Sequence, residues 1–304
     1  MTRNKILIGP SSFAEKDKSP LELLQKNGYS VINNPYGRKL TTTELLQLLQ
    51  PDVIGLIAGL EKLDREVMKA SSLRCISRVG SGMSNVDLIA AKDLNIAVRS
   101  TPDGPTQSVA ELTLGSLLSL LRLIPEMNED LHNGKWSKKI GFELRNKLCL
   151  VIGFGRIGKR VADFLHAFGA DIVVYDPYLQ SQIGYRKTER IEEILHAVDV
   201  ITIHSSGESC LLSGNEFSLM KDGVFILNAS RGNAIDEPSL IEALDTKKVR
   251  GAWLDTFVEE PYKGPLCRYK NVLLTPHVGS YTLECRREME MEAVNNLIST
   301  ISPE

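Results

Sequence analysis

Three side chains whose types suit catalysis stand just beyond short apolar runs in the second half of the chain: Arg231, Glu260 and His277. The imidazole of histidine ordinarily titrates at about pH 6.5, so it can remove or return a proton under physiological conditions. A carboxylate beside the ring would orient it and stabilise its charged form. A guanidinium fork matches the paired oxygens of a carboxylate. The three residues together would suit the oxidation of an alcohol next to a carboxylate, or the reverse reduction.

A glycine-rich segment, Gly153-Phe154-Gly155-Arg156-Ile157-Gly158, follows an apolar run and precedes an amphipathic helical pattern. In such a strand–turn–helix the first glycine permits a tight turn. The second lets the backbone approach a pyrophosphate, and the third lets the helix pack closely on the strand. The phosphates would lie at the N-terminus of the helix, where free N–H groups favour negative charge. The segment predicts a dinucleotide site; the alternative is a glycine turn in a sheet that binds no nucleotide.

Asp176 follows the next apolar run, where an acidic residue of such a site accepts hydrogen bonds from ribose hydroxyls. Its carboxylate would repel a 2′-phosphate, so we expect NAD rather than NADP. The alternative is a solvated residue at the end of a strand. Each of the three candidate catalytic residues also has a structural alternative: Arg231 as a surface ion-pair partner, Glu260 as a loop charge before a proline, and His277 as a strand-end histidine.

Short apolar runs alternate with helical patterns along the chain, which is typical of parallel sheets with crossover helices. A cluster of turn formers at 100–105 separates two such series. We expect an α/β fold with two Rossmann-like or flavodoxin-like domains: a NAD-binding domain, 101–280, inserted into a substrate-binding domain, 1–100 with 281–304, and the chemistry in a cleft between them. The expected strands are 5–9, 53–58, 75–79, 148–152, 171–175, 200–203, 224–228, 251–254 and 272–274, and the expected helices are 20–27, 43–49, 87–94, 106–123, 157–168 and 283–299.

Composition excludes several classes of function. The formal net charge is −2 over 304 residues, with no clustered basic face, so no nucleic-acid partner is expected. No apolar run approaches the length of a membrane span, and the first thirty residues lack the pattern of a signal peptide. The five cysteines are dispersed without a C-x-x-C pair, so neither a metal site nor a disulfide framework is predicted. We expect a cytoplasmic protein with reduced thiols.

Over nearly its whole length the sequence resembles the D-isomer-specific 2-hydroxyacid dehydrogenases. The matching segments are Gly153–Gly158, Tyr175-Asp176-Pro177, Asn228–Gly232, Leu254–Pro261 and Thr275-Pro276-His277. The resemblance implies NAD-dependent hydride transfer, with Arg231, Glu260 and His277 as catalytic residues and His277 as the acid–base. It also implies a set of cofactor-binding residues, namely Thr101, Gly153, Gly155, Arg156, Ile157, Gly158, Asp176, Ser205, Ala229, Ser230, Arg231, Asp255, His277, Gly279 and Ser280.

The segment Arg78-Val79-Gly80-Ser81 and the residues after it resemble the substrate loop of the phosphoglycerate dehydrogenases of this family, R-x-G-x-G-x-D-N-V-D. Arg78 stands where such enzymes place an arginine near the substrate phosphate. The glycines of the loop can present backbone N–H groups to an anion. Lys138 and Lys139 resemble a basic segment that a neighbouring subunit contributes. The alternatives are a strand-end salt bridge for Arg78 and a solvated loop for the lysines.

This resemblance implies oxidation of D-3-phosphoglycerate to 3-phosphohydroxypyruvate, the entry to serine synthesis. Two departures affect the details: Ser84 replaces an acid of the loop, and the segment 205–210 after His204 is shorter than H-x-P-L-T-P-E-T. The chain stops soon after its last helix, so control through a C-terminal regulatory domain is not expected. The alternatives are a reductase for glyoxylate, hydroxypyruvate or another 2-oxo acid, and a NAD(H)-sensing protein like the corepressors that share this fold.

A homodimer is also expected. The helix predicted at 106–123 is too apolar to face water alone, and members of the family pair through this region.

Overall fold

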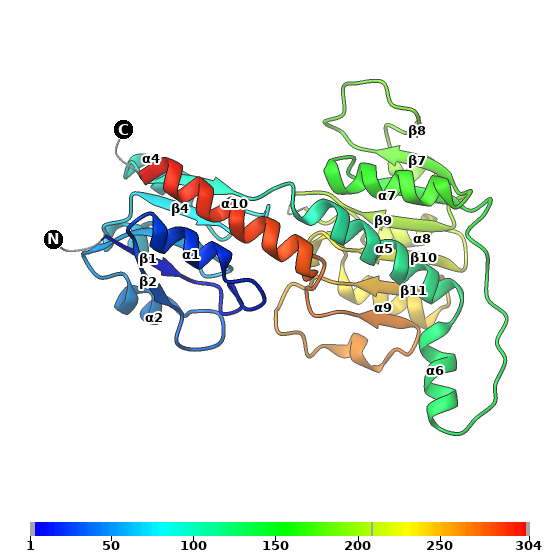
Figure 1. Cartoon of the computed structure of the whole chain (residues 1–304). Helices are drawn as coiled ribbons and strands as arrows, with labels where there is room; N and C mark the ends of the chain where they lie inside the picture. The colour runs from blue at the N-terminus through cyan, green and yellow to red at the C-terminus, as the bar shows by residue number, and fades with distance from the viewer. Residues whose placement is uncertain (1–3, 208, 302–304) are drawn as a thin grey trace. The chain divides into compact units, whose positions relative to one another are not determined.

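The computed structural model describes residues 4–207 and 209–301. It divides the chain into two compact units, which we call unit 1 (1–105 with 280–304) and unit 2 (106–279). The sequence predicts domain boundaries at 100/101 and 280/281, and the two compact units divide at 105/106 and 279/280. Figure 1 traces both units by residue number.

Unit 1 is built on a five-stranded parallel sheet in the order β2-β1-β3-β4-β5. This is the flavodoxin-like arrangement, in which the strand order reverses next to the first strand. The strands are β1 (Lys5–Ile8), β2 (Ser30–Asn33), β3 (Val53–Ala58), β4 (Cys75–Arg78) and β5 (Ala97–Ser100).

Helices cover both faces of this sheet. On one face, alternate strand residues such as Leu56 and Ile76 pack with α2, α3 and α4. On the other face, Ile57 and Cys75 pack with α1 and α10. The C-terminal helix therefore completes the core of the N-terminal unit. The helices are α1 (Ser19–Lys26), α2 (Thr42–Leu48), α3 (Arg65–Lys69), α4 (Leu88–Asp93) and α10 (Leu283–Ile301).

Unit 2 is built on a seven-stranded sheet in the order β12-β11-β10-β9-β6-β7-β8, and all neighbouring strands are parallel. This is the dinucleotide-binding order, with one further strand at the edge. Because all strands run the same way, their carboxyl ends meet at one edge. The strands are β6 (Leu148–Ile152), β7 (Asp171–Tyr175), β8 (Arg186–Lys187), β9 (Val200–Ile203), β10 (Val224–Asn228), β11 (Val249–Leu254) and β12 (Val272–Leu274).

The helices of unit 2 also form two layers, as Figure 1 shows. On one face, Leu117 of α5 and Val161 of α7 pack on Val151 and Trp253. On the other face, α8 and α9 pack on residues such as Ile152. The helices are α5 (Pro105–Leu121), α6 (Ile124–His132), α7 (Arg156–Ala167), α8 (Gly214–Leu219) and α9 (Glu237–Asp245), and short 3-10 turns lie at Ile191–Glu193, Gly232–Ala234 and Pro265–Arg268.

The helix expected at 106–123 is shorter than the sequence indicated, because α5 ends at Leu121 and a second helix, α6, begins at Ile124. Leu123 adopts a left-handed backbone conformation (φ +54°), which ends the first helix. Within the described ranges no single helix is long and apolar enough to cross a membrane; α5 and α6 meet the length and composition only as a pair bent by 64°.

Candidate active site

Three loops follow adjacent strands at the carboxyl edge of the unit 2 sheet, and each carries one of the predicted catalytic residues. Arg231 follows β10, Glu260 follows β11 and His277 follows β12. Since β10, β11 and β12 are neighbours in the sheet, residues far apart in the sequence reach the same edge. Functional groups of parallel α/β sheets gather at such carboxyl ends.

His277 and Glu260 are hydrogen-bonded, and the carboxylate holds the ring in place. His277 Nδ1 lies 3.1 Å from Glu260 Oε1 and 3.0 Å from Oε2. The His277 side chain is 43% exposed and that of Glu260 33%. Because Nδ1 is engaged, Nε2 is the nitrogen left to exchange a proton with a substrate. The pair has the base–orienter geometry that general acid–base catalysis requires.

The loop that carries His277 is held by the buried carboxylate of Asp255, which is 1% exposed. Asp255 Oδ1 accepts hydrogen bonds from the Thr275 hydroxyl (2.6 Å) and from Val278 N (2.9 Å), and Oδ2 accepts from Gly279 N (2.8 Å). A Cβ at Gly279 would lie 3.0 Å from Oδ2, so this approach needs a glycine. Asp255, predicted to contact the cofactor, therefore holds both sides of the His277 loop.

Arg231 is presented by a turn that Asn228 organises. Asn228 is 1% exposed; its Oδ1 accepts from Ser230 N (3.0 Å) and from the Ser230 hydroxyl (2.8 Å), and its Nδ2 donates to Arg231 O (2.8 Å). A Cβ at Gly232 would lie 2.0 Å from the Phe257 carbonyl carbon. The absence of a side chain at Gly232 thus lets the turn pack against the loop that carries Glu260.

The glycine-rich turn has the close packing that its sequence predicts. Gly153 has φ +88°, and a Cβ at Gly158 would lie 1.9 Å from Gly153 O. Nothing within 4 Å would meet a Cβ at Gly155, which caps α7 without a side-chain hydrogen bond. The turn is therefore tight on its inner side and open where α7 begins, as a pyrophosphate at a helix N-terminus requires.

Asp176, beyond β7, lies beside this turn. Its Oδ2 accepts a hydrogen bond from Phe154 N (2.8 Å), and its Oδ1 accepts from Tyr178 N (2.9 Å). Each oxygen keeps a second lone pair for a ribose hydroxyl. The carboxylate thus fixes the turn and is oriented to receive a further donor.

Three side-chain atoms at the same edge are buried without a hydrogen-bond partner among the described residues: Ser205 Oγ, Thr256 Oγ1 and His204 Nδ1. Buried polar groups without partners are rare in folded proteins. Ser205 N lies 2.7 Å from the position of a Cβ on Gly153, so Ser205 is adjacent to the glycine-rich turn. These atoms, together with the open Gly155, fit a bound dinucleotide.

His204 predicts a measurable acid sensitivity. Burial lowers the pKa of its imidazole from 6.5 to about 3. Between these two pH values the unfolded chain binds one more proton at His204 than the folded chain does. The free energy of unfolding is therefore highest above about pH 6.5, and it falls as the pH drops by at most about 1.4 kcal/mol per pH unit. We expect His204→Gln to reduce the slope of unfolding free energy against pH by about one proton. Urea unfolding at several pH values measures it; an unchanged slope contradicts the prediction.

In unit 1, the predicted substrate residues form a turn at the end of β4. Gly80 has φ +125°, and a Cβ there would lie 2.0 Å from Arg78 Nη1. Arg78 Nη1 donates to Val79 O. Thr101 is fully buried; its hydroxyl accepts from Gly80 N at 2.7 Å. Thr101, expected at the cofactor, thus supports the substrate turn, whereas Ser81 is exposed.

The other predicted site residues lie at separate places in the structure. Ala229 lies in the Asn228 turn, and Arg156 and Ile157 open α7. Ser280 falls in unit 1. Lys138 is exposed, whereas Lys139 pairs with Glu126 (2.7 Å) and Asp130 (3.4 Å) of α6, which argues against Lys139 as a substrate ligand. Of the shortened segment 205–210, residue 208 lies outside the described residues.

A family model described as D-isomer specific 2-hydroxyacid dehydrogenase, NAD binding domain, matches residues 114–279, more than half of the chain. The chain belongs to this family. The match covers the glycine-rich turn, Asp176 and the three loops with Arg231, Glu260 and His277. The α/β fold with two parallel sheets predicted from the sequence is confirmed.

Relatives within the family are similar over most of the chain. A D-3-phosphoglycerate dehydrogenase of Methanocaldococcus jannaschii is 38% identical over 82% of this chain and 49% of its own length. That of Escherichia coli K12 is 34% identical over 91% and 71%. The solved NADPH-dependent glyoxylate/hydroxypyruvate reductase of Sinorhizobium meliloti matches with a TM-score of 0.86 and 28% identity, covering 99% of this chain and 95% of that one. The chain spans about half the length of several curated relatives it matches.

Two further residues position the loops that carry Arg231 and His277. Asn228 was recognised only as part of a motif, and Thr275, whose hydroxyl accepts from Trp253 Nε1 at 3.0 Å and donates to Asp255, was not singled out. An asparagine that ends a wholly apolar strand is the one signal that indicates such a buried turn in advance.

Proposed function

We propose that this family member oxidises a D-2-hydroxy acid, or reduces the corresponding 2-oxo acid, with a nicotinamide dinucleotide. The observation that carries the proposal is the His277–Glu260 pair at the carboxyl edge of a dinucleotide-type sheet. NAD, when bound, supplies the hydride acceptor. His277 Nε2 takes the hydroxyl proton, Glu260 stabilises the charged ring, and Arg231 binds the substrate carboxylate. Turnover of any 2-hydroxy acid, followed by NADH absorbance, tests it; a NAD(H)-sensing protein would show none.

We propose D-3-phosphoglycerate as the substrate and 3-phosphohydroxypyruvate as the product, as in serine biosynthesis. Arg78 and the backbone of the Val79–Ser81 turn would bind the phosphate, and the names of the relatives at 34% to 38% identity support this choice. Lys138 is proposed as a further phosphate ligand, which a neighbouring subunit would supply. The second candidate is a 2-oxo acid reductase, which the name of the structurally similar S. meliloti enzyme supports.

Replacing Arg78 separates these candidates. We expect Arg78→Met to lower kcat/KM for 3-phosphoglycerate by about 10- to 100-fold, because a charged hydrogen bond contributes about 1.5–3 kcal/mol. The kcat/KM for D-glycerate, which lacks the phosphate, should change by less than about threefold. Initial rates with both substrates measure this. Equal losses on both substrates, or a wild type that strongly prefers unphosphorylated acids, would contradict phosphoglycerate as the substrate.

We propose NAD as the preferred cofactor because the Asp176 carboxylate, beside the glycine-rich turn, would repel a 2′-phosphate of NADP. We expect Asp176→Ala to shift the ratio of kcat/KM for NAD over NADP by about 10-fold or more toward NADP, mostly through KM, since the repulsive charge is lost. Asp171→Ala, at the other end of β7, is the matched control. A wild type that uses both cofactors equally would remove this prediction.

We propose that the protein is a homodimer that pairs through α5, α6 and the segment after them. α6 exposes Ile124 (50%) and Leu131 (56%), and the segment after it exposes Trp136 (81%) and Ile140 (95%). Apolar side chains exposed in one stretch are typical of a surface that a partner covers. Light scattering on the purified protein tests the proposal, and a monomeric mass would refute it.

A further inference from the structure

Glu61 places a buried carboxyl group at the carboxyl edge of the unit 1 sheet. It follows β3 and is 2% exposed. Two glycines make room for it: a Cβ at Gly9 would lie 2.0 Å from Glu61 Oε1, and one at Gly59 would lie 3.0 Å from Oε2. Gly59 N donates to Oε1 at 2.8 Å, and Asn85 Nδ2 donates to the carbonyl of Glu61 at 2.7 Å. The backbone of two loops is thus shaped around this one side chain.

Two cations act on the Glu61 carboxyl group. Burial is the largest influence and holds the pKa of this carboxyl group above its ordinary value, while the hydrogen bond from Gly59 and the charges of Arg78 and Lys39 oppose the rise. Arg78 ends β4, next to β3 in the sheet. Arg78 is also the residue proposed to bind the substrate phosphate. The charge of Glu61 therefore bears directly on how strongly Arg78 attracts an anion.

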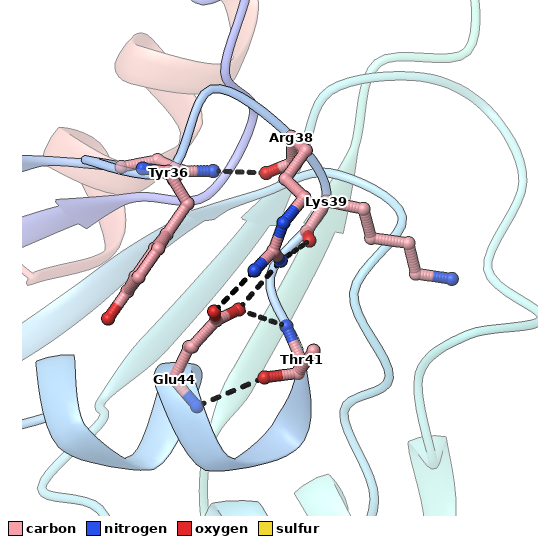
Figure 2. A network of polar contacts seen from close by, with 6 residues as sticks. Tyr36, Arg38, Lys39, Thr41 and Glu44 are labelled. Carbon is pink, nitrogen blue, oxygen red and sulfur yellow. Dashed lines mark hydrogen bonds and ion pairs between the residues drawn. The ribbon is translucent and has the colours of Figure 1, made fainter.

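Lys39 belongs to the loop between β2 and α2, which Figure 2 shows. In this loop the guanidinium of Arg38 is neutralised by Glu44, at 2.9 Å and 2.6 Å, and Glu44 also accepts from Thr41 N. Figure 2 shows the Lys39 side chain extending away from this network. No ion pair of Lys39 occurs in the part of the chain that the structure describes. Since the charges of Arg38 and Glu44 cancel, the net charge that this loop brings is the positive charge of Lys39.

The loop is tied to the Glu61 site through its backbone. Asn34 Nδ2 donates to Gly9 O (2.7 Å) and to Arg38 O (2.8 Å). Gly9 in turn lies against the Glu61 carboxyl group. The loops that follow β1, β2, β3 and β4 thus bring together one acid, Glu61, and two cations, Arg78 and Lys39. The net charge of these three side chains is +1 when Glu61 is ionised and +2 when it is neutral.

We propose that Glu61 is a specificity-determining residue: its carboxylate sets the net charge of the subsite formed with Arg78 and Lys39, and thereby restrains binding of a dianionic phosphate relative to an uncharged hydroxyl. The inference rests on the proposed function, because it takes Arg78 as a substrate residue. Glu61 does not touch the reacting carbon in this proposal; it acts through the potential at Arg78.

The test compares Glu61→Gln with wild type on 3-phosphoglycerate and D-glycerate. Glutamine keeps the shape and removes the charge. We expect KM for 3-phosphoglycerate to fall about 10-fold, KM for D-glycerate to change less than about twofold, and kcat to stay within about twofold. Glu61→Asp, which keeps the charge, should retain wild-type discrimination, and Glu66→Gln, an exposed acid of α3, is the matched control. An unchanged ratio of the two KM values, or an equal rise of both, overturns the proposal.

A second measurement needs no catalysis. Thermal unfolding of the whole chain with inorganic phosphate should show a larger increase in Tm for Glu61→Gln than for wild type. Lys39→Met, which changes the charge in the opposite sense, should show a smaller increase. If no hydroxy acid is oxidised by wild type, the proposed function fails, yet these phosphate shifts still decide the role of Glu61. Equal shifts in all three proteins overturn it.

Discussion

Replacing His277 by glutamine is expected to lower kcat by about 10²- to 10⁴-fold, the contribution ordinarily made by a positioned general acid–base. Glutamine can hydrogen-bond to Glu260 but cannot take up the proton that leaves the hydroxyl group. Initial rates of NADH formation with the best substrate measure the loss. KM should change much less than kcat, because the proton is transferred only in the transition state.

The stability of the His277→Gln protein is the control for this experiment. The His277 side chain is 43% exposed and sits on a loop, so His277→Gln should unfold at the wild-type urea concentration. Glu260→Gln should give a smaller loss of kcat than His277→Gln, since it removes the orienting charge and leaves the base. If the His277→Gln protein forms NADH at the wild-type rate, the assignment of the base is wrong.

Replacing Asp255 by alanine is expected to reduce both stability and activity. Three donors that it satisfies, the Thr275 hydroxyl, Val278 N and Gly279 N, would be left without their acceptor. Each buried unsatisfied donor costs about 1–3 kcal/mol, and relaxation of the loop recovers part of this, so we expect the free energy of unfolding to fall by about 2–4 kcal/mol. We expect kcat to fall by about 10- to 100-fold, because His277 loses its fixed position.

Urea unfolding and initial rates measure the two effects on the same preparation. Asp222→Ala is the matched control, because the Asp222 side chain is 87% exposed and pairs with Lys248 at 3.3 Å. Its loss should cost less than about 1 kcal/mol. Asp255→Ala with wild-type kcat would show that the His277 loop holds its shape without this carboxylate.

The sequence predicted the parts of the fold that local signals determine. The runs that form β6, β7 and β10 have an apolar centre and end at a glycine, an aspartate or an asparagine, so their bounds were predicted without error. The glycine-rich turn was predictable because each glycine has a steric reason that does not depend on distant residues. Arg231, Glu260 and His277 could be singled out because each follows a strand of the same sheet, although their catalytic role stays a prediction.

Other features depend on contacts between distant residues. Leucine at 123 gives no sign of a left-handed backbone, so the break between α5 and α6 was missed. That Asp255 binds 275–279, rather than only a ligand, follows from the adjacency of β11 and β12. Glu61 is an ordinary surface residue by type, and only the glycines at positions 9 and 59 reveal that it is buried.

The distribution of these residues over the two units has a consequence for evolution and engineering. Arg231, Glu260 and His277 all belong to unit 2, whereas Glu61, Arg78 and Lys39 all belong to unit 1, and each unit has its own core. Under the proposed function, choice of substrate can then diverge by changes in the loops of unit 1, while the residues proposed for proton transfer in unit 2 are inherited intact. A mutational library restricted to 34–39, 59–61 and 78–81 should yield altered substrate ranges in proteins whose unit 2 keeps its fold.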